Sequence, residues 1–145
     1  MSSENYAVID FMEHFWFHAF GIHMQVDACQ AGVSDTVEVI NEFFALVELG
    51  HVAQAASYLI AKYKYIKQGF DSCSNVAPVF NQGINELLRI SSISDFTKST
   101  FKAFEENMFQ FSKNSIEFSI YLVIKDWPKI GDTTGELTKM ILEQL

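Results

Sequence analysis

Apolar side chains recur at intervals of three and four residues from one end of this chain almost to the other. That spacing places them along one face of an α-helix, whereas a half-buried β-strand would alternate apolar and polar residues. No alternating run stands beside an Asn-Gly or Asp-Gly turn, the usual signal of a hairpin. The sequence therefore predicts an all-α fold.

Turn and capping residues divide the apolar pattern into four to five helices. The predicted helices cover residues 4–30, 35–68, 75–93, 95–127 and a short stretch after Thr133. Gly50 is the natural place for a break in the second of them, and Pro128 disfavours helix in the residue before it. At 145 residues, the chain has the size of one domain. We expect a single all-α domain, 1–145, folded as a helical bundle with one long helix at about 95–127.

The first predicted helix carries apolar side chains on most of its sides. Asp10, His14 and His18 share one narrow polar arc, because residues four apart lie on the same helical face. Such a helix is buried between neighbours or at an oligomer interface. Ionisable side chains interrupt it too often for a membrane span, so we expect no transmembrane segment.

Negative charge is concentrated in the first part of the chain. All ten Lys and Arg residues lie at or beyond Lys62, whereas eight of the 18 acidic residues precede it, and the net charge is −8. Binding to nucleic acid requires Lys and Arg to neutralise phosphates, so no nucleic acid is expected. An acidic surface can instead steer a basic protein partner onto itself. We expect the contacts to come from six polar side chains: Asp10, His14, His18, Asp35, Glu38 and Glu42.

Known catalytic motifs are missing from the sequence. It contains no Gly-x-Ser-x-Gly elbow, phosphate-binding loop or dinucleotide fingerprint. Cys29 and Cys73 stand alone, without a Cys-x-x-Cys motif or a disulfide framework. No secretory signal is visible. We expect a cytoplasmic protein that is not an enzyme and needs no cofactor.

The histidines nevertheless leave a metal site open as an alternative. His14 and His18 are spaced to lie on one helical face, and Glu48-x-x-His51 is a motif that lines di-iron bundles. Imidazole and carboxylate groups suit zinc, iron or manganese. A metal-binding bundle would use His14, His18, Glu48 and His51, and a second Glu-x-x-His motif would have to come from a homodimer.

Aromatic side chains are abundant, with 14 Phe, five Tyr and two Trp. Phe15, Trp16 and Phe17 are consecutive, so they point in three directions and cannot all face one neighbour. Apolar surface left over by a monomer marks a partner site. We therefore expect a homo-oligomer, formed through the first helix or the long one.

The amphipathic stretch 101–117, which begins Phe101-Lys102-Ala103-Phe104, is loosely similar in pattern to phasins, the helical proteins that coat polymer granules. That resemblance implies a coat protein as a further alternative. The leading prediction is a small acidic helical interaction module, such as an inhibitor, immunity-type, adaptor or chaperone protein. It would bind a basic partner protein and self-associate.

Overall fold

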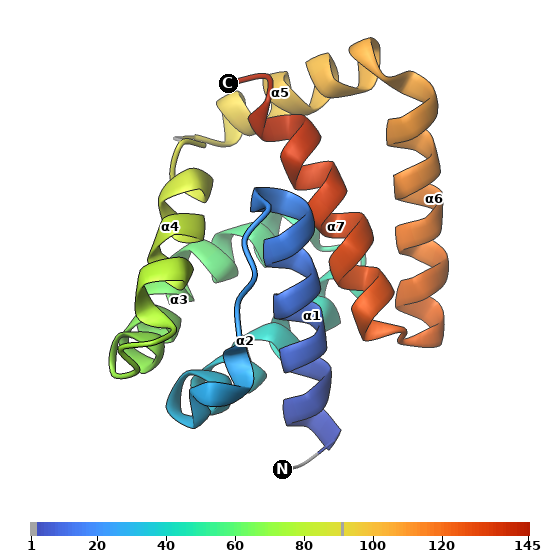
Figure 1. Ribbon diagram of the computed structural model, residues 1–145. Coiled ribbons are helices and arrows are strands. Elements are labelled where there is room, and N and C mark those ends of the chain that lie inside the picture. The colour runs from blue at the N-terminus through green and yellow to red at the C-terminus, as the bar shows by residue number, and fades with distance from the viewer. Residues whose placement is uncertain (1–2, 91) are drawn as a thin grey trace.

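The computed structural model describes residues 3–90 and 92–145, and these fold into seven α-helices and one short 3-10 helix (Figure 1). The elements are α1 (Ser3–Phe20), η1 (Val26–Ala28), α2 (Gln30–Glu48), α3 (Val52–Asp71), α4 (Ala77–Leu87), α5 (Ile93–Glu106), α6 (Met108–Ile124) and α7 (Trp127–Leu142). The all-α prediction is confirmed. The predicted number of four to five helices is wrong, because two of the expected helices are each divided by a break.

Two glycines with positive φ mark helix ends in the first half of the chain. Gly50, at φ 80°, separates α2 from α3, as the sequence predicted. Gly21, at φ 69°, follows α1, so the helix expected at 4–30 ends at Phe20. A residue without a Cβ adopts this left-handed conformation at little steric cost, which is why glycine occurs there.

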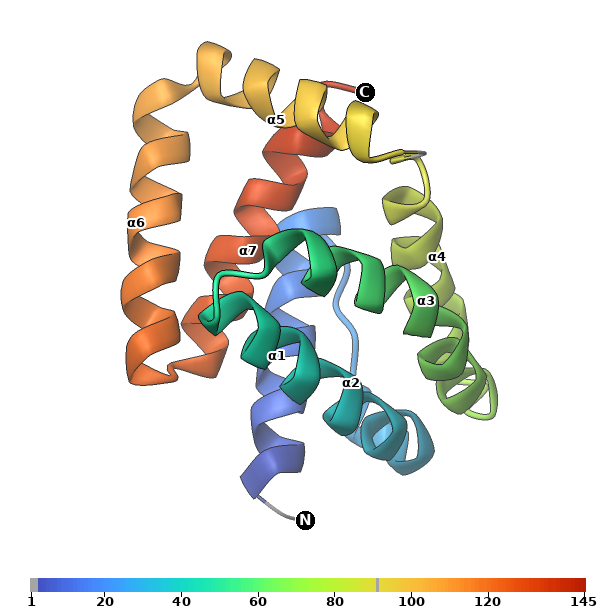
Figure 2. The same ribbon diagram turned by 180° about the vertical axis from the view of Figure 1, so that it is seen from behind.

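The prediction of one long helix at 95–127 is also wrong, because the chain changes direction at Asn107. This residue has φ −138° and ψ 55°, which ends α5 and begins α6. Both helices pack against α7, and a single straight helix could not follow both contacts. The corner is visible where α5 crosses the top of the molecule and α6 runs down its side (Figures 1 and 2).

The last helix begins earlier than the sequence suggested. The Asp126 side chain accepts a hydrogen bond from the Lys129 backbone N–H and caps α7. Pro128 lies in the first turn, where its missing N–H costs little. Pro128 therefore lies inside the first turn of α7, after α6 has already ended at Ile124.

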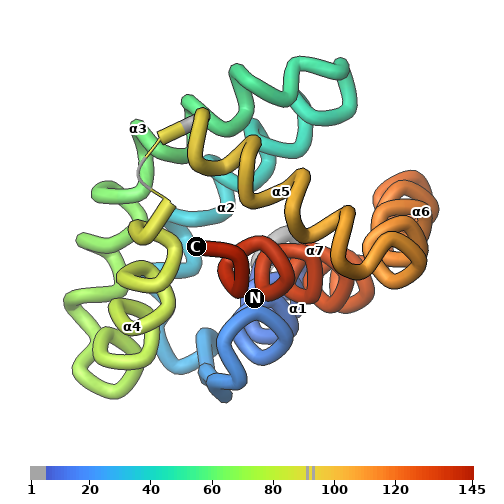
Figure 3. Tube along the Cα trace, turned by 90° about the horizontal axis from the view of Figure 1, so that it is seen from above, coloured from blue at the N-terminus to red at the C-terminus, as the bar shows by residue number. Residues whose placement is uncertain are grey.

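Helices α1 and α7 lie side by side at the centre of the molecule, and the others are arranged around them (Figure 3). The α2–α3 hairpin and α4 cover one side, and α5 and α6 wrap the other side of α7. In the core, the Trp16 ring of α1 stacks on Phe80 of α4, which in turn stacks on Phe70 of α3. Buried aromatic contacts thus join α1 to α3 and α4, which lie far from it in sequence.

A disulfide bond joins Cys29 to Cys73 across a sequence separation of 44. Cys29 precedes α2 and Cys73 follows α3, so the antiparallel hairpin brings the two residues together. The expectation that both cysteines stand alone is wrong, because it considered only their spacing along the chain. Across the part of the chain that the structure describes, no helix combines the length and apolarity that a membrane crossing requires.

Candidate functional site

The backbones of α1 and α7 approach each other closely because two glycines of α7 face α1. A Cβ added to Gly131 would lie 2.5 Å from the Phe11 carbonyl oxygen. A Cβ added to Gly135 would lie 2.7 Å from the His18 Cβ. Both distances are shorter than any real Cβ contact, so only glycine permits this approach.

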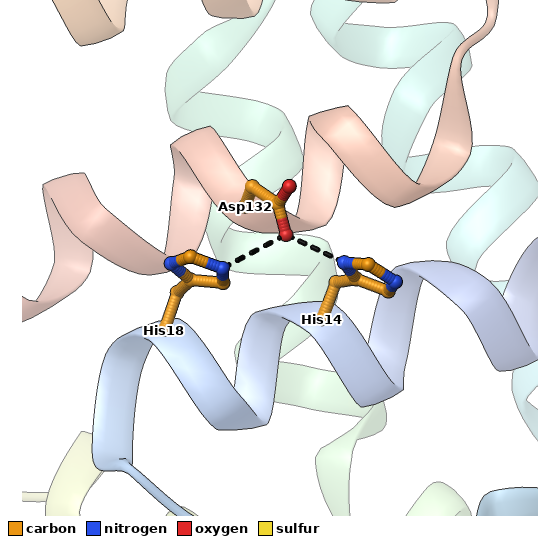
Figure 4. Close-up of side chains that lie close together, drawn as sticks. All are labelled: His14, His18 and Asp132. Carbon is orange, nitrogen blue, oxygen red and sulfur yellow. Dashed lines mark hydrogen bonds and ion pairs between the residues drawn. The ribbon is translucent and has the colours of Figure 1, made fainter.

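This close approach brings two pairs of side chains into one cluster, each pair spaced i, i+4 on its helix. His14 and His18 project from α1, and Asp132 and Glu136 project from α7. The Asp132 Oδ1 atom lies 2.6 Å from His14 Nδ1 and 3.0 Å from His18 Nε2 (Figure 4). The second ring nitrogen of His18, Nδ1, lies 2.8 Å from Glu136 Oε1. We call these four residues the His–carboxylate cluster.

The cluster is half-buried, which leaves its outer side in contact with solvent. The His18 side chain is 29% exposed and that of Asp132 is 23% exposed. One nitrogen from each of His14 and His18 and one Asp132 oxygen lie within 4.8 Å of one another. Two imidazoles and a carboxylate at this separation can hold a single cation between them.

The structure brings together only part of the metal site predicted from the sequence. His14 and His18 are grouped with Asp132, whereas Glu48 and His51 do not belong to that group. Both are exposed, Glu48 at the end of α2 and His51 directly before α3. Asp132 and Glu136 were not predicted from the sequence. Their i, i+4 spacing, each directly after a glycine, was the available signal.

The acidic residues predicted to bind a partner have different environments. Asp35 is half-buried against α3, where its charge and its hydrogen bond with the Tyr65 hydroxyl raise the pKa of Tyr65. Glu38 and Glu42 are exposed. Burial is the main cause that raises the pKa of Tyr58, and the negative charges of Glu42 and Glu38 raise it further. Asp35 thus already interacts with Tyr65 inside the fold, whereas the exposed side chains of Glu38 and Glu42 are accessible to a partner protein.

On α1, Asp10 is half-buried beside Glu13. Burial is the main cause that raises the pKa of Glu13, and the charges of Asp27 and Asp10 add to it. The Glu13 carboxylate also accepts a hydrogen bond from the Val26 backbone N–H, which acts in the opposite direction. Asp10 therefore lies near another acidic group, and this makes the middle of α1 locally negative.

A third surface with a distinct character is the outward side of α6. Five large apolar side chains are exposed there, and we call them the α6 face: Phe109, Ile116, Ile120, Val123 and Ile124. The opposite side of α6 packs against α7, and α6 also meets α5.

Comparisons of the chain with protein-family models, curated protein sequences and solved structures found no match.

Proposed function

We propose that the chain is a protein–protein interaction module that self-associates through the α6 face. The observation that carries this proposal is the exposure of large apolar side chains on one side of a single helix. Phe109 is 82% exposed, Val123 is 81% exposed and Ile116 is 61% exposed. Single exposed apolar residues are ordinary, but a contiguous apolar patch marks an interaction surface.

The spacing of the α6 face suits a second α-helix. Phe109, Ile116 and Val123 are seven residues apart, which is the heptad interval of helices that pack side by side. The 17 residues of α6 span about 25 Å at about 1.5 Å per residue. A partner helix of similar length could cover the whole α6 face.

The balanced charge of α6 allows a second copy of the chain to supply that helix. The protein carries a net charge of −8, so two copies repel each other over much of their surface. The charged residues of α6 are Lys113 and Glu117, which form an i, i+4 pair. The α6 face therefore carries no net charge, and two copies can meet there. A basic partner would be drawn to the acidic first half instead.

Sedimentation equilibrium on Ile116→Asp tests this proposal against a matched control, Ile60→Asp. Ile60 lies on α3 and is 64% exposed, so both substitutions place a carboxylate at an equally open position. We expect a wild-type dimer that Ile116→Asp weakens at least tenfold and Ile60→Asp leaves unchanged. A monomeric wild type, or equal weakening by both variants, would overturn the proposal. Flotation of a monomeric chain with neutral lipid vesicles would favour the coat-protein alternative.

A second function, the binding of a basic partner, is favoured by the exposed carboxylates of α2. In the described structure, neither Glu38 nor Glu42 forms an ion pair with a basic side chain. Unpaired exposed charges are available to set the rate and selectivity of association. We expect Glu38→Lys/Glu42→Lys to reduce binding of an oligolysine peptide, and its salt dependence, more than the α5 control Glu105→Lys/Glu106→Lys. Equal losses would remove α2 from this role.

We also infer that the folded chain works in an oxidising compartment. The support is the Cys29–Cys73 disulfide, since such bonds persist outside the reducing cytosol. This proposal replaces the cytoplasmic location expected from the sequence. A thiol-alkylating reagent added to acid-quenched cells and denatured protein should label neither cysteine, and labelling of both would restore the cytoplasmic expectation.

A further inference from the structure

We propose that His14, His18 and Asp132 bind one divalent transition-metal ion of the Zn²⁺ type, and that Glu136 orients His18 for this task. The site joins α1 to α7 across a sequence separation of 118. It is independent of the α6 face, because none of its residues lies on α6.

The arrangement of the ligand atoms fits a small ion. Two histidines four residues apart on one helix can coordinate the same ion, and Asp132 supplies an oxygen from the facing helix. A tetrahedral Zn²⁺ with bonds of about 2.0 Å holds its ligand atoms about 3.3 Å apart. The Asp132 Oδ1 atom now lies 2.6 Å from His14 Nδ1 and 3.0 Å from His18 Nε2, so these two pairs need to separate by less than an ångström. The half-exposed side chains have room for this movement on their solvent side.

Glu136 supplies the support that a metal-binding histidine normally has. When His18 Nε2 binds the ion, its Nδ1 carries the proton and donates a hydrogen bond to Glu136 Oε1, 2.8 Å away. A ligating histidine almost always donates its other N–H to a carboxylate or carbonyl group, which fixes the ring orientation. Both the ligand and its supporting carboxylate are therefore already in place.

With His18 neutral, one of its two close carboxylate contacts lacks a proton. A neutral imidazole carries one N–H, so it can donate to Asp132 or to Glu136 but not to both, and only an imidazolium would donate to both. A divalent ion at His18 Nε2 would leave Nδ1–H for Glu136 and would bind Asp132 directly. One ion thereby gives both ring nitrogens of a neutral His18 a favourable partner.

The backbone around the cluster is held firmly by the α1–α7 contact. Gly131 and Gly135 directly precede Asp132 and Glu136, and both glycines press against the α1 backbone or Cβ atoms. The α7 residues consequently have little freedom to move away from the two histidines. A site with ligands on two tightly packed helices is preorganised, which reduces the cost of binding.

The ligand set also indicates which metals the site selects. Imidazole nitrogen suits zinc, iron, copper and nickel, whereas Mg²⁺ and Ca²⁺ prefer oxygen ligands throughout. With three protein ligands, a tetrahedral ion keeps one position open to solvent. We therefore expect tight Zn²⁺ binding and no competition from Mg²⁺ at similar concentrations.

Calorimetric titration and native mass spectrometry with Zn²⁺, on untagged protein freed of metal by a chelator, test the site. We expect one ion per chain, and at least tenfold weaker binding in His18→Ala and in Asp132→Asn. The second variant keeps the shape of the side chain and removes its charge, so it separates binding from folding. Glu136→Gln should weaken binding by about 10- to 100-fold, as loss of a supporting carboxylate does elsewhere.

His23→Ala and His51→Ala are matched controls, because both histidines are exposed and lie outside the cluster. We expect each control to bind Zn²⁺ as the wild type does, with an unchanged circular dichroism spectrum. A wild type that binds no ion overturns the proposal. Equal weakening by the controls and by His18→Ala also overturns it, because the ion would then bind at histidines in general.

Discussion

Loss of the Cys29–Cys73 disulfide is the perturbation whose effect on stability can be worked out most directly from the structure. Replacing both residues by alanine removes the bond and leaves no free thiol. Cys29 is fully buried and Cys73 is half-buried, both beside helix ends. The main consequence should lie in the unfolded chain, which gains freedom when the loop is opened.

The expected magnitude follows from the length of that loop. For a sequence separation of 44, the loop-closure relation gives about 13 cal/mol/K, or about 4 kcal/mol at 25 °C. A domain of this size has a total unfolding free energy of roughly 5–15 kcal/mol. The bond thus accounts for a large part of the stability of the fold.

Urea unfolding followed by circular dichroism measures this difference. With an m-value of about 2 kcal/mol/M, a loss of about 4 kcal/mol lowers the midpoint by about 2 M. Cys73→Ala alone should behave like the double variant, because either change opens the loop. Adding a reductant should lower the wild-type midpoint and leave the double variant unchanged, which separates the bond from side effects of the reagent.

Two results would refute this reasoning. Two titratable thiols in protein purified without reductant would show that the bond does not form. A difference below about 1 kcal/mol between the wild type and the double variant would show that the loop is already restrained in the unfolded chain. The first result would also weaken the inference of an oxidising compartment.

Two further substitutions test the α1–α7 contact and the link between α3 and α4. Gly135→Ala should lower the unfolding free energy measured in urea by about 1–3 kcal/mol, because the new Cβ meets His18 and the Phe15 carbonyl. Helix propensity alone predicts a higher unfolding free energy for alanine, and that result would contradict the close contact between α1 and α7. Hydrogen bonds from Lys67 and Asn81 hold the pKa of Asp71 below its ordinary value. The ionised carboxylate therefore stabilises the fold fully at a pH above the ordinary pKa, and this stabilisation is lost as the pH falls through the lower pKa of the folded state. Asp71→Asn should therefore be less stable than the wild type at neutral pH and approach it in acid, and a difference independent of pH would exclude this origin.

Features of the fold that depend on a few neighbouring residues were predictable from the sequence. Helical spacing indicated an all-α fold because the three- and four-residue interval is a local property of the helix. Gly50 indicated a break for the same reason, since its backbone conformation depends on the residue itself. Helix ends that depend on distant packing were missed. The apolar pattern runs through Asn107 without interruption, and the corner there follows from the contacts of α5 and α6 with α7.

The residues of the candidate metal site were likewise predictable from the sequence only in part. The sequence alone placed His14 and His18 on one face of one helix, because four residues complete about one helical turn. It could not select Asp132 and Glu136 from the other acidic residues, since they lie more than a hundred residues away and meet the histidines only where Gly131 and Gly135 let α7 approach α1. Pairing of Cys29 with Cys73 likewise required the α2–α3 hairpin. Helical periodicity is local and legible in the sequence, whereas contacts between helices depend on how the whole chain packs.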